Sequence, residues 1–198
     1  VRKLPSGCHG FWDGRTLDIR TYWQPRLEPD AARSYPDACA QARECLERAV
    51  KRRLVADVPV GVFLSGGMDS SIVAACAQRG SAERVSTFSI GFPEKKFDER
   101  HYARQVADHL GTDHRFLEVT PDSLEDLRAV VGSFEEPFCD ASLLPTWLLA
   151  RFTRQYVKVA LSGDGADELF GGYYRYRVMH WARLADRVPL ALRALLKR

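Results

Sequence analysis

The sequence contains no apolar run that approaches the roughly 20 residues a helix needs to cross a bilayer. It also lacks a positively charged start that leads into an apolar signal core. These two absences predict a cytoplasmic protein with no membrane partner. The 198 residues are 45% apolar and 28% charged, a composition typical of a soluble globular protein with one substantial core.

Neither sign of charge dominates the chain. The formal net charge is +3, and the basic residues are spread along the sequence rather than massed in one segment. A surface that binds nucleic acid normally carries a dense basic patch. The sequence therefore predicts no nucleic-acid partner.

Closely spaced cysteine pairs of the Cys-x-x-Cys type are absent, which argues against a metal or redox centre built on cysteine. We expect the cysteines to be reduced, mostly buried, small apolar residues. Cys8 adjoins His9, but adjacency in sequence does not place two side chains in one catalytic site. The five cysteines are Cys8, Cys39, Cys45, Cys76 and Cys139.

Two common phosphate-binding patterns do not fit the glycine-rich part of the chain. A Walker loop needs Gly, four residues and Gly-Lys-Ser/Thr, and a dinucleotide fingerprint needs three spaced glycines. The strand-like run 60–64 is followed instead by Ser65-Gly66-Gly67-Met68-Asp69-Ser70-Ser71, and a helical pattern begins at Ile72.

This strand, tight loop and helix predict a cradle for phosphate. Glycines let backbone amides face inward, serines add hydroxyl donors, and a helix N-terminus carries a partial positive charge. An ordinary glycine turn between a strand and a helix is the alternative. Two glycines, an acid and two hydroxyls at one turn exceed what packing needs.

Strand and helix patterns alternate after residue 30. Strands are predicted at 58–64, 85–92, 114–119 and 156–161, and helices at 36–55, 72–80, 98–111, from 120–123 onward and around 148–152. This order predicts an α/β fold, a parallel sheet with helices on both faces. Residues 1–30 carry isolated aromatics and turn residues instead, and Asp13-Gly14 predicts a short β-hairpin there.

Acidic residues gather at two further turns. The predicted strand 156–161 ends at Ser162-Gly163-Asp164-Gly165-Ala166-Asp167-Glu168, and Glu135 to Ser142 form a carboxylate-rich turn before a helix. Ligands of parallel sheets bind at the carboxyl ends of the strands, where the glycine loop also lies. Three acids in one loop repel each other unless a cation or a helix N-terminus is near. Magnesium bridging carboxylates and phosphates meets that need, and acidic capping of a helix start is the alternative.

Together, five stretches in this order resemble the synthetase domain of the glutamine-dependent asparagine synthetase family. That family belongs to the ATP pyrophosphatase (PP-loop) superfamily, whose fold is like that of the adenine nucleotide alpha hydrolases. The resemblance covers residues 40–180 and rests on 57–71, 87–92, 97–99, 136–138 and 161–168.

The resemblance implies an activity and its cofactors. Aspartate, the default carboxylate substrate, attacks ATP to give β-aspartyl-AMP and pyrophosphate, and ammonia from glutamine then gives asparagine and AMP. The cofactors implied are ATP and Mg²⁺, with Asp69 and Asp167 as metal ligands. Asp164 is placed to organise the acyl-adenylate, so the implied catalytic residues are Asp69, Asp164 and Asp167. The residues implied to bind ATP and pyrophosphate are Leu64, Ser65, Gly66, Gly67, Asp69, Ser70, Ser71, Ile90, Ser162 and Gly163.

The resemblance also implies how the chain is divided. Residues 1–30 are a hairpin lead-in from a glutaminase domain that the chain does not contain, and 31–198 are the N-terminal part of the synthetase domain. We expect this fragment to be inactive alone. The stretch 189–198 is either a membrane-surface helix or, as we expect, a truncated helix. Its exposed leucines would favour self-association, hence a homodimer.

Three other functions stay open at this stage. A sulfur-inserting or lysidine-forming tRNA enzyme would share the adenylation step but should show a basic surface or paired cysteines. A β-lactam-forming relative, or an amidotransferase acting on another carboxylate, would differ only in the substrate pocket. A non-catalytic nucleotide-binding module would not need so many acids beside a phosphate loop.

Overall fold

A computed structural model describes residues 3–26, 28–30, 32–94, 98–119, 124–134 and 140–186. Three predicted features lie outside this part of the chain: the helix start at 120–123, the acidic turn over 135–139 and the stretch 189–198. The chain divides into two compact units, 1–41 and 42–198.

The first unit contains the predicted hairpin. Strands β1 (Cys8–Trp12) and β2 (Leu17–Thr21) pair antiparallel, with Cys8 opposite Thr21 and Trp12 opposite Leu17. The carboxylate of Asp13 closes the turn, since it accepts the amides of Arg15 and Thr16, both at 2.7 Å. The hairpin prediction at Asp13-Gly14 is confirmed.

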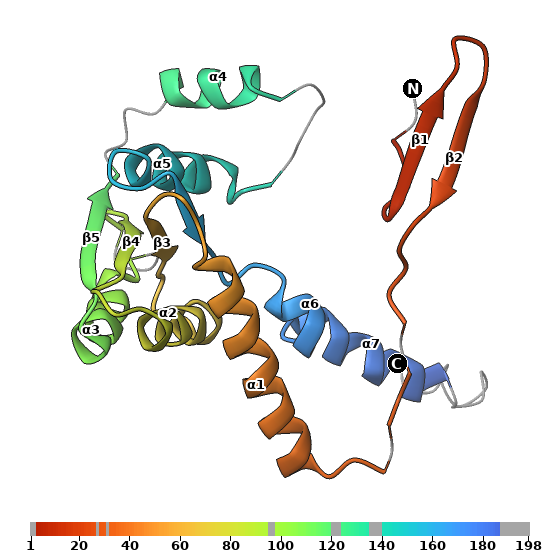
Figure 1. The fold of residues 1–198 in the computed structure, drawn as a ribbon, viewed down its shortest axis with the longest axis horizontal. Coiled ribbons are helices and arrows are strands. Elements are labelled where there is room, and N and C mark those ends of the chain that lie inside the picture. Colours follow the sequence, from red (N-terminus) through yellow and green to blue (C-terminus); the bar gives the residue numbers. More distant parts are fainter. Residues whose placement is uncertain are drawn as a thin grey trace, which may run out of the picture. The chain divides into compact units, whose positions relative to one another are not determined.

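The second unit is built on a four-stranded parallel sheet with strand order β5-β4-β3-β6. The strands are β3 (Val60–Phe63), β4 (Ser86–Gly91), β5 (Asp113–Glu118) and β6 (Val159–Leu161). Helix α2 (Met68–Gly80) joins β3 to β4, and α3 (Arg100–Leu110) joins β4 to β5. Helices α4 (Leu124–Gly132) and α5 (Leu143–Thr153) lead from β5 to β6. The predicted parallel α/β sheet is confirmed (Figure 1).

Helices cover both faces of this sheet (Figure 1). On one face the core is formed by Val62 and Leu64 with alanines of α2 and α3, among them Ala74 and Ala103. These small side chains let the helices approach the strands closely. On the other face Phe88 packs against Phe152 of α5, with ring centroids 6.1 Å apart.

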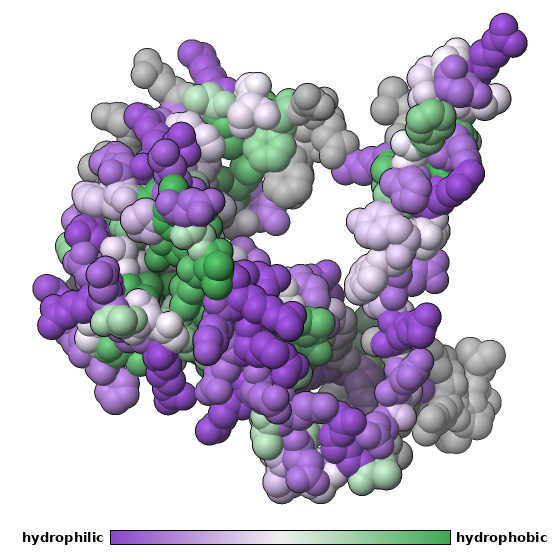
Figure 2. Space-filling view, viewed as in Figure 1, coloured by the Kyte–Doolittle hydropathy of each residue, from purple (hydrophilic) through white to green (hydrophobic). Residues whose placement is uncertain are grey.

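Helix α1 (Tyr35–Arg53) precedes the sheet and contributes Val50 to the first core. Its visible surface is mainly hydrophilic (Figure 2). Helices α6 (Ala166–Phe170) and α7 (Tyr174–Asp186) follow β6. No helix within the described ranges is both long and apolar enough to cross a membrane.

Three details of the sequence analysis are wrong. Helix α2 begins at Met68 rather than at Ile72, so Asp69, Ser70 and Ser71 lie in its first turn and not in the loop before it.

Strand β6 begins at Val159 rather than at residue 156, because the amides of Tyr156 and Val157 still bond to the carbonyl of Thr153 at the end of α5. The described cysteines are free, but Cys39 and Cys45 are exposed rather than buried. Cys45 lies off the stripe of α1 that is least exposed, and Cys39 lies in the N-terminal part of the helix, where every described residue is exposed.

Candidate functional site

The candidate site lies where the strand order reverses. The chain moves from β3 outward through β4 to β5, then returns to place β6 on the other side of β3. Val62 is paired with Leu161, so both strands end at the same level. Ligands of open parallel sheets bind in the crevice at such a switch point.

The loop after β3 is held by its own serines. The hydroxyls of Ser65 and Ser70 are 3.0 Å apart, and the amide of Ser65 donates to Ser70 Oγ at 3.2 Å. The amide of Gly67 donates to Ser65 Oγ at 3.2 Å, while the hydroxyl of Ser71 donates to the Gly67 carbonyl at 2.6 Å. Gly66 has a φ of +84°, a left-handed conformation that glycine adopts without strain. The serines therefore fix the shape of the loop.

The loop after β6 packs directly on the first turn of α2. A Cβ atom at Gly163 would lie 2.8 Å from the amide nitrogen of Ser70 and 3.0 Å from the carbonyl carbon of Asp69. Only a glycine allows this approach. The hydroxyl of Ser162 donates to Asp164 Oδ2 at 2.9 Å, which orients that carboxylate. The loop after β6 and the first turn of α2 thus meet, although about 95 residues separate them in the sequence.

The two loops and the end of β4 enclose a cavity of about 340 Å³. Most of the residues that the sequence singled out line it: Leu64, Ser65, Asp69, Ser70, Ile90, Ser162, Gly163, Asp164 and Asp167. Gly66, Gly67 and Ser71 do not line it and act within the loop instead.

The structure adds residues that the sequence analysis did not assign to the site. Glu99, the residue that precedes α3, lines the cavity. Tyr173, in the turn between α6 and α7, also lines it. Glu99 belongs to the stretch 97–99 that contributed to the family resemblance, which was an available signal. The other unassigned lining residues are Phe63, Phe88, Ser89, Phe92, Thr146, Leu149, Gly165 and Glu168.

The cavity is strongly acidic. Among the described residues that line it are five carboxylates and no Lys, Arg or His; the acids are Asp69, Glu99, Asp164, Asp167 and Glu168. The hydroxyl of Tyr173 donates to Glu168 Oε1 at 2.7 Å. This hydrogen bond lowers the pKa of Glu168 and raises the pKa of Tyr173. Glu168 is thereby held in its ionised form.

Within the described ranges, no three His, Cys, Asp or Glu side chains form a group that could hold a metal ion by themselves. Asp69, in the first turn of α2, and Asp167, in the first turn of α6, nevertheless line the same cavity. Two carboxylates together with ligand oxygens are a common arrangement for magnesium, which keeps several non-protein ligands.

Comparison with known proteins shows the family of this chain. The family model for asparagine synthase matches residues 41–198. The chain belongs to the asparagine synthase family. A putative glutamine-hydrolysing asparagine synthetase of Mycobacterium bovis is 40% identical over 98% of this chain and 30% of its own length.

Two further asparagine synthetases show the same partial coverage. Glutamine-hydrolysing asparagine synthetase 1 of Bacillus subtilis is 33% identical over 91% of this chain and 28% of its own length. Asparagine synthetase B of Escherichia coli is 32% identical over 98% of this chain and 38% of its own length. The chain therefore spans 28% to 38% of the length of these family members.

Solved structures also resemble this chain in part. The NH₃-dependent NAD synthetase of Campylobacter jejuni has a TM-score of 0.47 and 19% identity, over 68% of this chain and 60% of that one. The glutamine-dependent NAD⁺ synthetase of Acinetobacter baumannii, in complex with ADP, has a TM-score of 0.49 and 22% identity. This second match covers 74% of this chain and 29% of that one.

Proposed function

We propose that this chain binds ATP at the carboxyl ends of β3 and β6, as the adenylating part of an asparagine synthetase-type ligase. The observation that carries the proposal is the contact of loop 162–165 with the first turn of α2, which follows the glycine-containing loop 65–67, beside one acidic cavity. Its volume of about 340 Å³ falls within the roughly 300–1,000 Å³ of typical ligand sites.

The proposal assigns different residues to the base and to the phosphates. Leu64, Ile90, Ser162 and Gly163, which line the cavity, frame the adenosine. The first turn of α2 offers backbone amides and a partial positive charge to the phosphates. The proposed pyrophosphate-binding residues that line the cavity are Ser65, Asp69 and Ser70, and Gly66, Gly67 and Ser71 would contribute by shaping the loop.

The residues present fit a hard cation. Carboxylate oxygens are ligands that magnesium prefers, and Asp69 and Asp167 supply them from the first turns of α2 and α6. Five carboxylates beside a polyphosphate would repel it, and no described basic side chain lines the cavity to offset that charge. A magnesium ion held by Asp69 and Asp167 would stabilise the negative charge that develops on the departing pyrophosphate.

The proposed reaction has two steps. The substrate carboxylate attacks the α-phosphorus of ATP, which releases pyrophosphate and leaves an acyl-adenylate. Ammonia derived from glutamine then attacks the acyl carbon and releases AMP. Aspartate is the proposed substrate because the relatives are named asparagine synthetases. Asp164, oriented by Ser162, is the residue that organises the acyl-adenylate.

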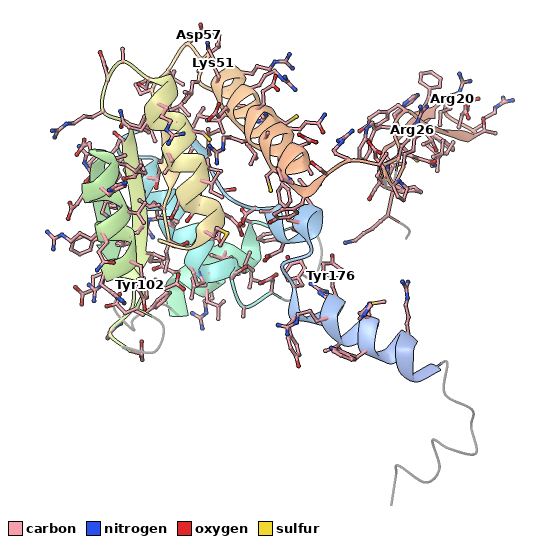
Figure 3. The ribbon with its side chains drawn as sticks, turned by 90° about the horizontal axis from the view of Figure 1, so that it is seen from below. Arg20, Arg26, Lys51, Asp57, Tyr102 and Tyr176 are labelled. Carbon is pink, nitrogen blue, oxygen red and sulfur yellow. The ribbon has the colours of Figure 1, made fainter. Side chains whose placement is uncertain are left out.

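Calorimetric titration with ATP, with and without magnesium, tests this function. We expect magnesium-dependent binding that Asp69→Ala weakens by about tenfold or more, because a charged ligand position is lost. Asp57→Ala is the matched control. Asp57 is exposed and lies at the end of the sheet opposite Tyr102 of α3, a residue that adjoins Gly66 of the phosphate loop (Figure 3).

Two outcomes would count against the proposal. Binding that changes with neither magnesium nor Asp69→Ala would favour a nucleotide-binding module without chemistry. Equal losses in Asp69→Ala and Asp57→Ala would show that the charge of the whole chain, rather than this cavity, governs binding.

A further inference from the structure

An ion-pair cluster, Asp98–Arg100–Glu118, lies beside the cavity but does not line it. Arg100, the first residue of α3, holds Asp98 with two parallel bonds, Nε to Oδ1 at 2.7 Å and Nη2 to Oδ2 at 2.9 Å. Its third nitrogen, Nη1, is 3.0 Å from Glu118 Oε2 at the end of β5. The side chains of Arg100 and Asp98 are only 25% and 24% exposed.

The Arg100 side chain also crosses the end of β4. A Cβ atom at Gly91 would overlap the Cγ, Cδ and Nε atoms of Arg100, so this glycine makes room for the side chain. The guanidinium carbon lies 5.7 Å from the ring centroid of Phe116 on β5. Arg100 thus joins the ends of two strands to the start of α3.

The start of α3 in turn supports the phosphate loop. A Cβ atom at Gly66 would lie 2.5 Å from the carbonyl carbon of Tyr102 and 2.5 Å from the amide nitrogen of Ala103. The loop backbone therefore rests on the peptide between these two residues. Both of their amides donate to the carbonyl of Glu99, at 3.0 and 3.1 Å, and Glu99 lines the cavity.

We propose that Arg100 is a positioning residue, which fixes the first turn of α3 and through it the phosphate loop and Glu99. The contacts run from Glu118 and Asp98 through Arg100 to Glu99, then through the Tyr102–Ala103 peptide to Gly66. The role proposed for the loop rests on the ATP-binding function proposed above; the support that α3 gives to the loop does not.

A second effect of Arg100 is electrostatic. Its hydrogen bonds lower the pKa of Asp98, and Asp98 raises the pKa of Arg100, so both groups stay charged. Without the guanidinium, Asp98 and Glu118 would add two unbalanced carboxylates near a cavity that already holds five. Loss of Arg100 should therefore weaken the binding of a polyphosphate by both routes.

The test compares Arg100→Gln with Arg79→Gln. Arg79 forms an ion pair of 3.6 Å with Glu47 and its side chain is 72% exposed, so it serves as the surface control. Amide hydrogen exchange over residues 64–71, measured without nucleotide, reports the order of the loop. Calorimetry with ATP and magnesium reports the affinity.

We expect Arg100→Gln to speed exchange in the loop by about fivefold or more and to weaken ATP binding by about tenfold. Arg79→Gln should change neither. Arg100→Lys should be intermediate, because an ammonium group keeps the charge but cannot form the two-pronged contact with Asp98.

Loop exchange that is the same in Arg100→Gln and the wild type would overturn the proposal. If Arg100→Gln fails to fold, loop exchange is measured in Arg100→Lys and Glu118→Gln instead. Unchanged exchange in both of these variants would also overturn the proposal. If the wild type binds no ATP, the proposed function fails, while the exchange measurement still decides whether Arg100 positions the loop.

Discussion

At the residue scale, the site depends on one contact between backbones. Gly163 approaches the Asp69–Ser70 peptide so closely that no side chain fits between the loop after β6 and the first turn of α2. The contact brings the phosphate loop of α2 against the acidic loop after β6. Asp69 and Asp167 line a common cavity as a result.

Gly163→Ala should therefore separate the two loops. We expect ATP affinity to fall by about tenfold or more. Stability should fall by about 1–3 kcal/mol, the usual cost of forcing extra atoms into a packed position. Calorimetry and chemical denaturation measure the two effects.

Gly132→Ala is the matched control, since a Cβ atom there would meet no neighbouring atom within 4 Å. At the end of α4 it should leave ATP affinity unchanged and leave stability equal or higher by up to about 1 kcal/mol. Equal losses from Gly163→Ala and Gly132→Ala would show that the contact between the loops has no special importance.

At the scale of elements, the pairing of β4 with β5 contains a half-buried histidine. His114 Nδ1 lies 3.0 Å from Thr87 Oγ1, and Nε2 lies 3.3 Å from Ser89 Oγ. Burial lowers the pKa of His114 below its ordinary value of 6.5. Asp108 and Asp113 oppose this shift and Arg104 adds to it, but burial has the largest effect.

The stability of the sheet should therefore depend on pH near neutrality. Because the folded state favours neutral His114, its contribution is fully present above the unfolded pKa of about 6.5 and is lost as pH falls below it. Chemical denaturation at pH 7 and pH 5 should show lower stability at pH 5. His114→Gln should show a smaller decrease, and an identical decrease in both proteins would refute this role.

The types of the elements were largely predictable, whereas their boundaries and faces were less so. Apolar runs and glycines predicted β3, β4 and β5, and Gly111 ends α3 in the left-handed conformation, as expected of a helix terminus. The end of α5 was not predictable, because Tyr156 and Val157 have the residue types of a strand but bond to the carbonyl of Thr153 at the end of the helix. The exposed face of α1 depends on which side meets the sheet, and local sequence does not determine that.

At the scale of the whole molecule, the sequence alone predicted that the glycine-containing stretch 65–71 and the acidic stretch 162–168 lie at the same edge of a parallel sheet. This was possible because all parallel strands end at the same edge. Sequence could not place β6 beside β3, since that pairing joins segments about 95 residues apart and depends on packing. Tyr173 was not assigned for the same reason, because only the folded chain brings it to the cavity, whereas the stretch 97–99 of the family resemblance was a signal for Glu99.

Several whole-molecule expectations stay predictions. They are the role of residues 1–30 as a lead-in from a glutaminase domain, the assignment of 31–198 as the N-terminal part of the synthetase domain, the homodimer, the cytoplasmic location and the inactivity of the chain by itself. The same holds for a β-lactam-forming or other carboxylate-specific activity, which the nucleotide site alone does not distinguish from asparagine synthesis.

The central claim is that the loops after β3 and β6 form one nucleotide site. A titration of the ¹⁵N-labelled chain with ATP and magnesium, followed by amide chemical shifts, tests it most directly. We predict that residues 64–71 and 162–168 shift together with one affinity, while the hairpin turn at 13–16 does not move. Shifts confined to one loop, or centred on the separate pocket formed by Leu117, Glu118 and Arg151, would contradict it.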